Sequence, residues 1–313
     1  MGQFDRILDW AAGKVQKATG EAERRELVEK IKMVAQNFKN RVEEKIGRLN
    51  RMIEKFNEKV GILNTERQGI VKSNVDTLFN FLLKFGNVKE VGQYRLESER
   101  DLQAIPERKF ASIDAYISTI DWSRLDVELD TFFLTPIGMR IKTRNQNTSM
   151  NEQIARLQLE AESTLKQLEM QVSTTDLECR VCEEYTKVVR FISGFIKERI
   201  LPELSVVEAF FQALSIGNSV VAGQDLSKTN FRCDLAALSD SPYEKHYLFV
   251  KNAFAFYVFS CKIYNTPILT RLLNHEVDDS DNDALMMYQR QLLALGKEVD
   301  ANAIVFTAER EVD

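Results

Sequence analysis

The sequence predicts an all-α protein: an elongated antiparallel coiled-coil hairpin with an apolar helical bundle at one end. The chain of 313 residues holds only 5 prolines and 13 glycines, which favours long helices over short strands and turns. Apolar residues recur at every third or fourth position over residues 27–63, and the same rhythm returns after residue 150. Apolar residues make up 44% and charged residues 28%, a composition typical of a folded protein.

Four regions are expected along the chain. An amphipathic helix occupies residues 1–20, and a long helical hairpin occupies 21–203, with a mixed connector at 86–148. An apolar helical region at 204–275 is expected to pack on the hairpin. An acidic helix and tail follow at 276–313, where 3 Lys or Arg stand against 10 Asp or Glu.

The amino-terminal segment has one apolar face with lysines opposite. Such a helix lies on an anionic membrane surface or docks on its own protein, and docking is the commoner case. The residues that would face lipid are Phe4, Ile7, Leu8, Trp10, Ala11 and Val15.

The first long helix carries an apolar seam with steps of four and three residues, as in a coiled coil. One stutter is expected around Val42, where three four-residue steps follow each other. The seam consists of Leu27, Ile31, Val34, Phe38, Val42, Ile46, Leu49, Ile53, Phe56, Val60 and Leu63.

A second seam is predicted to begin at a capping box formed by Ser149 and Glu152. The Ser-Thr-Thr run at 173–175 is expected to loosen this helix, and Pro202 to end or kink it. Because the two helices are similar in length, we expect them to fold back as an antiparallel pair.

The connector contains a basic pattern with period two at 138–145, which overlaps a strand expected at 132–143. In an extended conformation Arg140, Lys142 and Arg144 would lie on one side and could contact an anion or an acidic partner. The favoured interpretation is a basic edge that prevents unwanted strand pairing.

Residues 204–223 carry a single charge, Glu208. This stretch could cross a bilayer if Glu208 were neutralised or paired. The favoured interpretation is a core helix with a tight turn at Gly217–Asn218. A second apolar helix is expected between Pro242 and Pro267, and a last helix near 284–296.

Three groups of residues have side chains that could bind a metal or take part in catalysis. Cys179 and Cys182 form a CxxC, but zinc would need two further ligands at metal-site spacing. A run of aspartates at 279–283 lacks the glycine and the terminal glutamate of a calcium loop. His246 and His275 belong to no catalytic motif. No metal site, cofactor or catalytic residue is therefore expected, and the protein is not expected to be an enzyme.

The predicted function is that of a non-enzymatic helical scaffold or assembly subunit, which acts through helix–helix contacts and self-associates. The alternative is a membrane-active helical protein that binds lipid or forms a pore on oligomerisation. Nucleic acid is not an expected partner, because the basic residues of 21–75 are interleaved with acidic ones. The four cysteines do not suggest a disulfide scaffold, so the expected location is the cytoplasm, with peripheral membrane attachment under the alternative.

Overall fold

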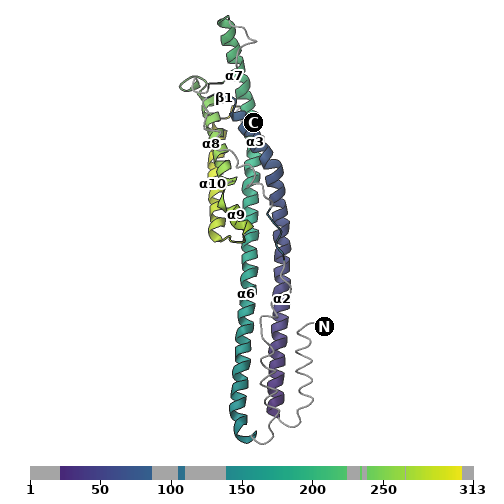
Figure 1. Ribbon diagram of the computed structural model, residues 1–313. Helices are drawn as coiled ribbons and strands as arrows, with labels where there is room; N and C mark the ends of the chain where they lie inside the picture. Colours follow the sequence, from purple (N-terminus) through teal and green to yellow (C-terminus); the bar gives the residue numbers. More distant parts are fainter. Residues whose placement is uncertain are drawn as a thin grey trace, which may run out of the picture. The chain divides into compact units, whose positions relative to one another are not determined.

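The described part of the chain is predominantly helical. The computed structural model (Figure 1) describes residues 22–86, 105–109, 139–223, 233–234, 238–264 and 266–304. Within them, strand is confined to β1 (Phe85–Gly86) and β2 (Cys233–Asp234), which pair in parallel. The prediction of an all-α protein is confirmed for these residues.

The chain divides into two compact units. Unit 1 comprises Met1–Lys55 and Arg108–Asp176, and unit 2 comprises Phe56–Glu107 and Leu177–Asp313. Two helices contribute to both units: α2 (Ala22–Glu66) and α6 (Met139–Phe195).

The core of unit 1 is a cluster of apolar side chains from α2 and α6. The α2 members are Ile31, Ala35, Phe38, Val42, Ile46, Leu49 and Ile53. The α6 members are Ile154, Leu157, Ala161, Leu165, Leu168 and Val172. Each series contains two consecutive four-residue steps, centred on Val42 in α2 and on Ala161 in α6. Lys45 and Arg48 of α2 both pair with Glu169 of α6 at the edge of this core.

The prediction of an antiparallel pair is wrong, because α2 and α6 run in the same direction. In unit 1 both helices begin at the same end (Figure 1). In unit 2 the residue numbers of cross-helix partners rise together, whereas they would run oppositely in an antiparallel pair. These partners are Lys59 with Glu183 and Glu66 with Arg190.

Several predicted helix boundaries also need correction. Helix α6 begins at Met139, ten residues before the predicted capping box, and it runs without a break through residues 173–175. The hydroxyl of Thr175 is accommodated there because it donates to the Gln171 carbonyl at 2.9 Å. Because α6 already includes 139–143, the strand predicted at 132–143 is not formed over those residues.

The helix continues past α6 with a change in geometry. A π-helical segment, η4 (Ile196–Ile200), leads into α7 (Leu201–Val221). Pro202 lies in the first turn of α7, directly after η4, and the helical run continues through it to Val221, so Pro202 does not end the helix. The turn predicted at Gly217–Asn218 is absent, since α7 continues through both residues.

Unit 2 adds further helices to its parts of α2 and α6. A second π-helical segment, η1 (Arg67–Val71), joins α2 to α3 (Lys72–Leu82). The later helices are α8 (Glu244–Tyr264), α9 (Pro267–Leu273) and α10 (Asp279–Ala301). Helix α8 packs against both α3 and α10, and Figure 1 shows α8 and α10 side by side.

Aromatic side chains fill much of the core of unit 2. The Phe256 ring of α8 stacks on Phe195 of α6, with ring centroids 4.9 Å apart, and lies 6.4 Å from Phe191. Leu285 and Leu292 of α10 are fully buried. This core therefore combines residues from the middle and from the last third of the sequence.

Candidate functional site

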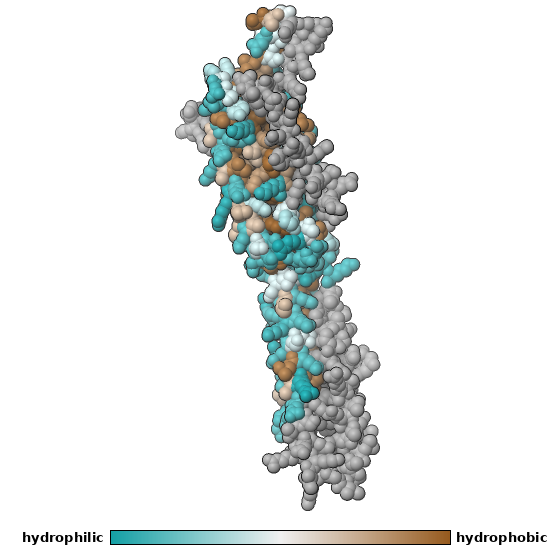
Figure 2. Space-filling view, turned by 60° about the vertical axis from the view of Figure 1, so that its left-hand side comes forward, coloured by the Kyte–Doolittle hydropathy of each residue, from teal (hydrophilic) through white to brown (hydrophobic). Residues whose placement is uncertain are grey.

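Helix α7 presents an apolar stripe to solvent. Its members are all exposed and follow steps of three, four, three and four residues, so they share one helical face. We define the α7 stripe as Val206, Ala209, Ala213, Ile216 and Val220. Exposure reaches 61% at Val220, and brown apolar surface is visible at the end of α7 in Figure 2.

The opposite side of α7 is fixed to the rest of unit 2. Leu204, Val207 and Phe211 are buried there, and the Phe211 ring meets Phe85 edge-on at 6.0 Å. Lys84 also binds both carboxylate oxygens of Glu208, at 2.8 and 2.9 Å. One face of α7 is therefore committed to the fold, and the stripe is not.

The stripe has the spacing of a helix-packing surface. It repeats the steps of three and four that are buried between α2 and α6 in unit 1, and it contains no charged residue. Ala209 and Ala213 lie in its middle, and small side chains allow another helix backbone to approach closely. The stripe is suited to contact with a second helix or with hydrocarbon.

Helix α7 also belongs to the one described helix that is long and apolar enough to cross a membrane. That helix runs from Ile154 to Val221, and only 22% of its most apolar stretch is buried. Length and composition alone do not distinguish such a helix from a core helix of a soluble protein. The low buried share of this stretch agrees with the exposure of the stripe residues.

The sequence-predicted site residues fall in different places. The six lipid-facing candidates between Phe4 and Val15 lie outside the described residues. Of the seam residues, Val34 is half-buried while its neighbour Ala35 is 1% exposed, and the side chain of Leu27 lies outside the described part. The other nine are buried: Ile31, Phe38, Val42, Ile46, Leu49, Ile53, Phe56, Val60 and Leu63.

The basic trio does not form the predicted extended edge. Arg140, Lys142 and Arg144 lie in the first turns of α6, and positions two apart on an α-helix are separated by about 200°. The shared side that period two predicted is therefore not formed.

The CxxC cysteines are buried in the core of unit 2. Cys179 and Cys182 are 1% and 0% exposed, and neither forms a disulfide bond. Burial raises the pKa of Cys182, and the nearby Cys179 and Glu178 raise it further. A thiol held protonated in this way is a poor nucleophile and a poor metal ligand.

The two histidines have different surroundings. His246 of α8 is buried against the Phe210 ring, with centroids 4.5 Å apart, and desolvation lowers its pKa. His275 contacts the buried carboxylate of Glu178 through Nδ1 at 2.8 Å. Neither histidine is paired with a described nucleophile.

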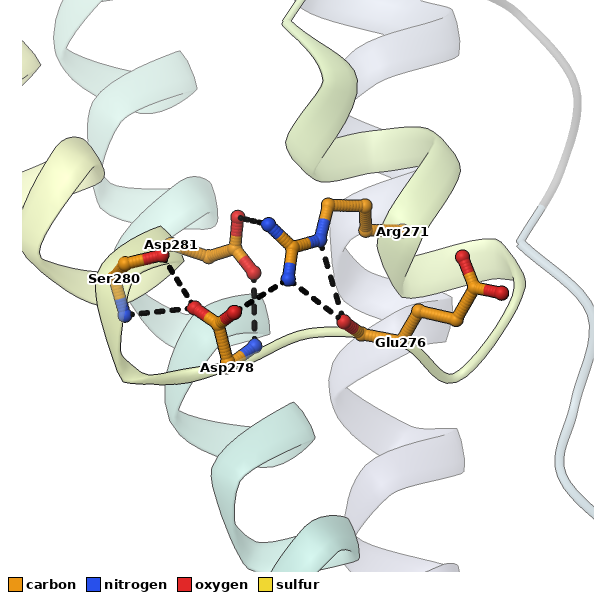
Figure 3. Close-up of polar contacts among 5 residues, drawn as sticks. All are labelled: Arg271, Glu276, Asp278, Ser280 and Asp281. Carbon is orange, nitrogen blue, oxygen red and sulfur yellow. Dashed lines mark hydrogen bonds and ion pairs between the residues drawn. The ribbon is translucent and has the colours of Figure 1, made fainter.

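The aspartate run is a helix start (Figure 3). Asp278 is the N-cap of α10, and one of its side-chain oxygens accepts a hydrogen bond from the Ser280 N–H at 2.8 Å. The side chain of Asp281 accepts a hydrogen bond from the Asp278 N–H, which completes a capping box. Arg271 bridges both carboxylates and also donates to the Glu276 carbonyl. These oxygens are already committed to hydrogen bonds, and no group of metal-ligating side chains occurs in the described residues.

Sequence reasoning missed several buried polar residues of unit 2, notably Arg67, Glu178 and Glu203, each 0% exposed. One of them had a signal. Arg67 stands four residues after Leu63, so an extension of the seam spacing would have placed it in the core although its side chain is charged. Nothing comparable marked Glu203, which accepts from the backbone N–H of Ile304 more than a hundred residues away.

Comparisons of the chain with protein families, with curated proteins and with solved structures gave no significant match.

Proposed function

We propose that the protein is a non-enzymatic helical scaffold that self-associates, with the α7 stripe of one copy packing against the α7 stripe of another. The observation that carries the proposal is the exposed three–four spacing of apolar residues on a helix whose other face is held by the fold. Coiled-coil pairing of α2 with α6, in parallel, would supply the rigid support.

A second copy is the occupant that the stripe fits best. A stripe of uncharged residues is self-complementary, since two copies related by a twofold axis bring the same apolar positions together. It lacks the charged positions that normally select a different partner helix. Isolated exposed apolar residues need no explanation, but five on one face at regular spacing mark an interaction surface.

Self-association can be measured by sedimentation velocity over a range of protein concentrations. Wild-type protein is expected to form dimers or larger species, and Ile216→Asp to shift the equilibrium toward monomer by at least tenfold in Kd. A carboxylate in the middle of an apolar helix interface would be desolvated without a partner, which is costly.

The matched control is Asn218→Asp, which adds the same charge two residues away on a different face of α7. Asn218 is exposed, so this variant is expected to associate like wild type. A wild-type protein that stays monomeric at high concentration would refute self-association, as would equal behaviour of the two variants.

A membrane-active function is the second candidate, and a specific observation favours it. Most of the apolar stretch in α7 is exposed, and its only acidic residue, Glu208, is paired with Lys84. Pairing lowers the cost of placing a carboxylate near hydrocarbon. In this case the occupant of the stripe would be a lipid bilayer.

The same two variants separate the candidates. In a bilayer every face of α7 meets hydrocarbon, so Ile216→Asp and Asn218→Asp should both reduce co-sedimentation with anionic liposomes and release of a trapped dye. In a helix–helix interface only Ile216→Asp should matter. Absence of liposome binding by the wild-type protein would exclude the membrane-active function.

A further inference from the structure

Arg67 is a buried cation at the junction of α2 and α3. It is the first residue of η1, and its side chain is 0% exposed. A guanidinium group stays protonated at any pH that a folded protein tolerates. Arg67 therefore carries a full positive charge into the interior of unit 2.

Among the described residues, the guanidinium of Arg67 has no hydrogen-bond partner. Its Nε, Nη1 and Nη2 atoms are all buried and unsatisfied. The guanidinium lies over the ring of Tyr264, whose centroid is 6.0 Å from Cζ, at the outer limit of a cation–π contact. That contact cannot replace five hydrogen bonds.

The hydroxyl of Tyr264 is unsatisfied as well. Tyr264 is 1% exposed, and its hydroxyl oxygen has no hydrogen-bond partner in the part of the chain that the structure describes. Burial raises the pKa of Tyr264, so the phenol remains a neutral hydrogen-bond donor. Two adjacent buried side chains therefore offer donors, and one of them brings a positive charge.

Such a combination calls for an anionic acceptor. A charge taken out of water is tolerated in a protein when it is paired and hydrogen-bonded, and unsatisfied buried groups are rare. The planar fork of an arginine matches two oxygens of one oxyanion. The segment itself gives independent support, because short π-helical stretches occur frequently at functional sites.

We propose that Arg67 and Tyr264 form a buried site for a small inorganic oxyanion of the phosphate or sulfate class. Arg67 would hold two oxygens, and the Tyr264 hydroxyl would donate to a third. Complete burial of Arg67 favours a free ion over a phosphate ester attached to a larger molecule. The site lies within unit 2, and the proposal does not depend on self-association through the α7 stripe.

Binding can be measured as a dependence of folding stability on phosphate. The full-length protein is unfolded in urea at a series of sodium phosphate concentrations, with ionic strength held constant by sodium chloride. Above the dissociation constant, each tenfold increase in phosphate should raise the folded-to-unfolded ratio of wild-type protein about tenfold. Sodium sulfate should act in the same way.

Three variants make the test specific to the site. Arg67→Met, which keeps the length of the side chain and removes the charge, should lose the phosphate dependence. Tyr264→Phe removes only the hydroxyl and should need several-fold more phosphate for the same shift. Arg290→Met removes one exposed positive charge from α10 and should respond like wild type.

Two outcomes would overturn the proposal. One is a wild-type protein whose stability does not change with phosphate or sulfate. The other is a response that persists unchanged in Arg67→Met, or in Tyr264→Phe if Arg67→Met does not fold.

Discussion

The two units solve the problem of burying apolar surface in different ways. In the described part of unit 1, two helices bury one apolar seam each, and the buried polar residues there are two threonines, Thr164 and Thr175. In unit 2 the core draws on helices from distant parts of the sequence and includes Arg67, Glu178 and Glu203. Both π-helical segments of the described chain also belong to unit 2.

This difference suggests that unit 1 provides structural support and that unit 2 provides the binding surfaces. A repeated apolar seam stabilises a pair of helices without fixing any position that chemistry could use. Buried polar groups cost stability unless they are satisfied, so their concentration in unit 2 marks the part of the molecule where binding is expected. The α7 stripe and the Arg67 site are both in that unit.

The largest effect should come from truncating an aromatic residue in unit 2. Phe256→Ala removes a ring packed against Phe195 and Phe191 and should cost about 3–5 kcal/mol. Leu168 occupies a fully buried position of unit 1. Leu168→Ala should lower the free energy of unfolding less, by ~2–3 kcal/mol, because a two-helix seam relaxes more easily around a cavity. Urea denaturation gives both values, and a larger loss in Leu168→Ala would reverse the comparison.

The next prediction is that replacing a helical glycine by alanine changes stability in opposite directions in the two units. A Cβ at Gly47 of unit 1 would meet nothing within 4 Å, so Gly47→Ala should stabilise the protein by ~1 kcal/mol through helix propensity. A Cβ at Gly296 of α10 would lie 3.2 Å from two ring carbons of Phe195. That ring is held by its aromatic neighbours, so Gly296→Ala should destabilise by about 1–2 kcal/mol. Thermal unfolding of the two variants tests this, and stabilisation by both would show that the Phe195 ring is free to move.

Periodicity predicted the helices of unit 1 well, for a physical reason. A seam that is buried along its length must place apolar residues every three or four positions, and that spacing is visible in the sequence. The stutter at Val42 was read from the same spacing, and Val42 is 0% exposed. Val34 packs against the cluster while half-buried, and its neighbour Ala35 takes a buried position that the predicted seam did not include.

The direction of the helix pair could not be derived in this way. Seam spacing is identical in parallel and antiparallel pairs. The segment between the two seams is about 60 residues long and can span roughly 200 Å, whereas α2 is only about 68 Å long. Such a connector permits either direction, so the assumption of a direct return was unsupported.

The candidate sites in unit 2 depend on tertiary contacts. Whether α7 is a core helix or an exposed one was left open by its composition, and it proves to be buried on one face and exposed on the other. The Ser149–Glu152 pattern resembled a helix start but lies inside α6. Local signals of this kind carry less weight than packing, which lets a helix continue through a capping motif.

A smaller effect, specific to unit 2, should appear in the pH dependence of stability. Desolvation lowers the pKa of His246, while Glu203 opposes this shift without reversing it. The unfolded chain therefore binds a proton near pH 6.5 that the folded protein resists, so stability should fall as the pH drops below about 6.5. The slope for one group cannot exceed ~1.4 kcal/mol per pH unit.

His246→Gln should remove this contribution. The difference in unfolding free energy between variant and wild type should change between pH 7 and pH 5, and it should be constant above pH 7.5. Parallel stability curves across the whole range would show that His246 is accessible to protons in the folded protein.

The smallest effect should come from the start of α10, an exposed feature of the same unit. Hydrogen bonds from Ser280 and from Arg271 lower the pKa of Asp278 to about 2. A lowered carboxyl pKa contributes stability that is complete above the ordinary value near 3.8 and is lost as the pH falls toward 2. Asp278→Asn keeps an acceptor for the helix cap but loses the charge that Arg271 binds.

The melting temperature of Asp278→Asn should therefore lie slightly below that of wild type at pH 7, and the two should converge near pH 2. Asp283→Asn removes a charge from an exposed position one turn further along α10 and serves as the matched control. An equal decrease in both variants would mean that general helix-dipole electrostatics stabilises this terminus. A decrease confined to Asp278→Asn would mean that the Arg271 bridge does so, and the acidic run would then be explained by the fold without a bound cation.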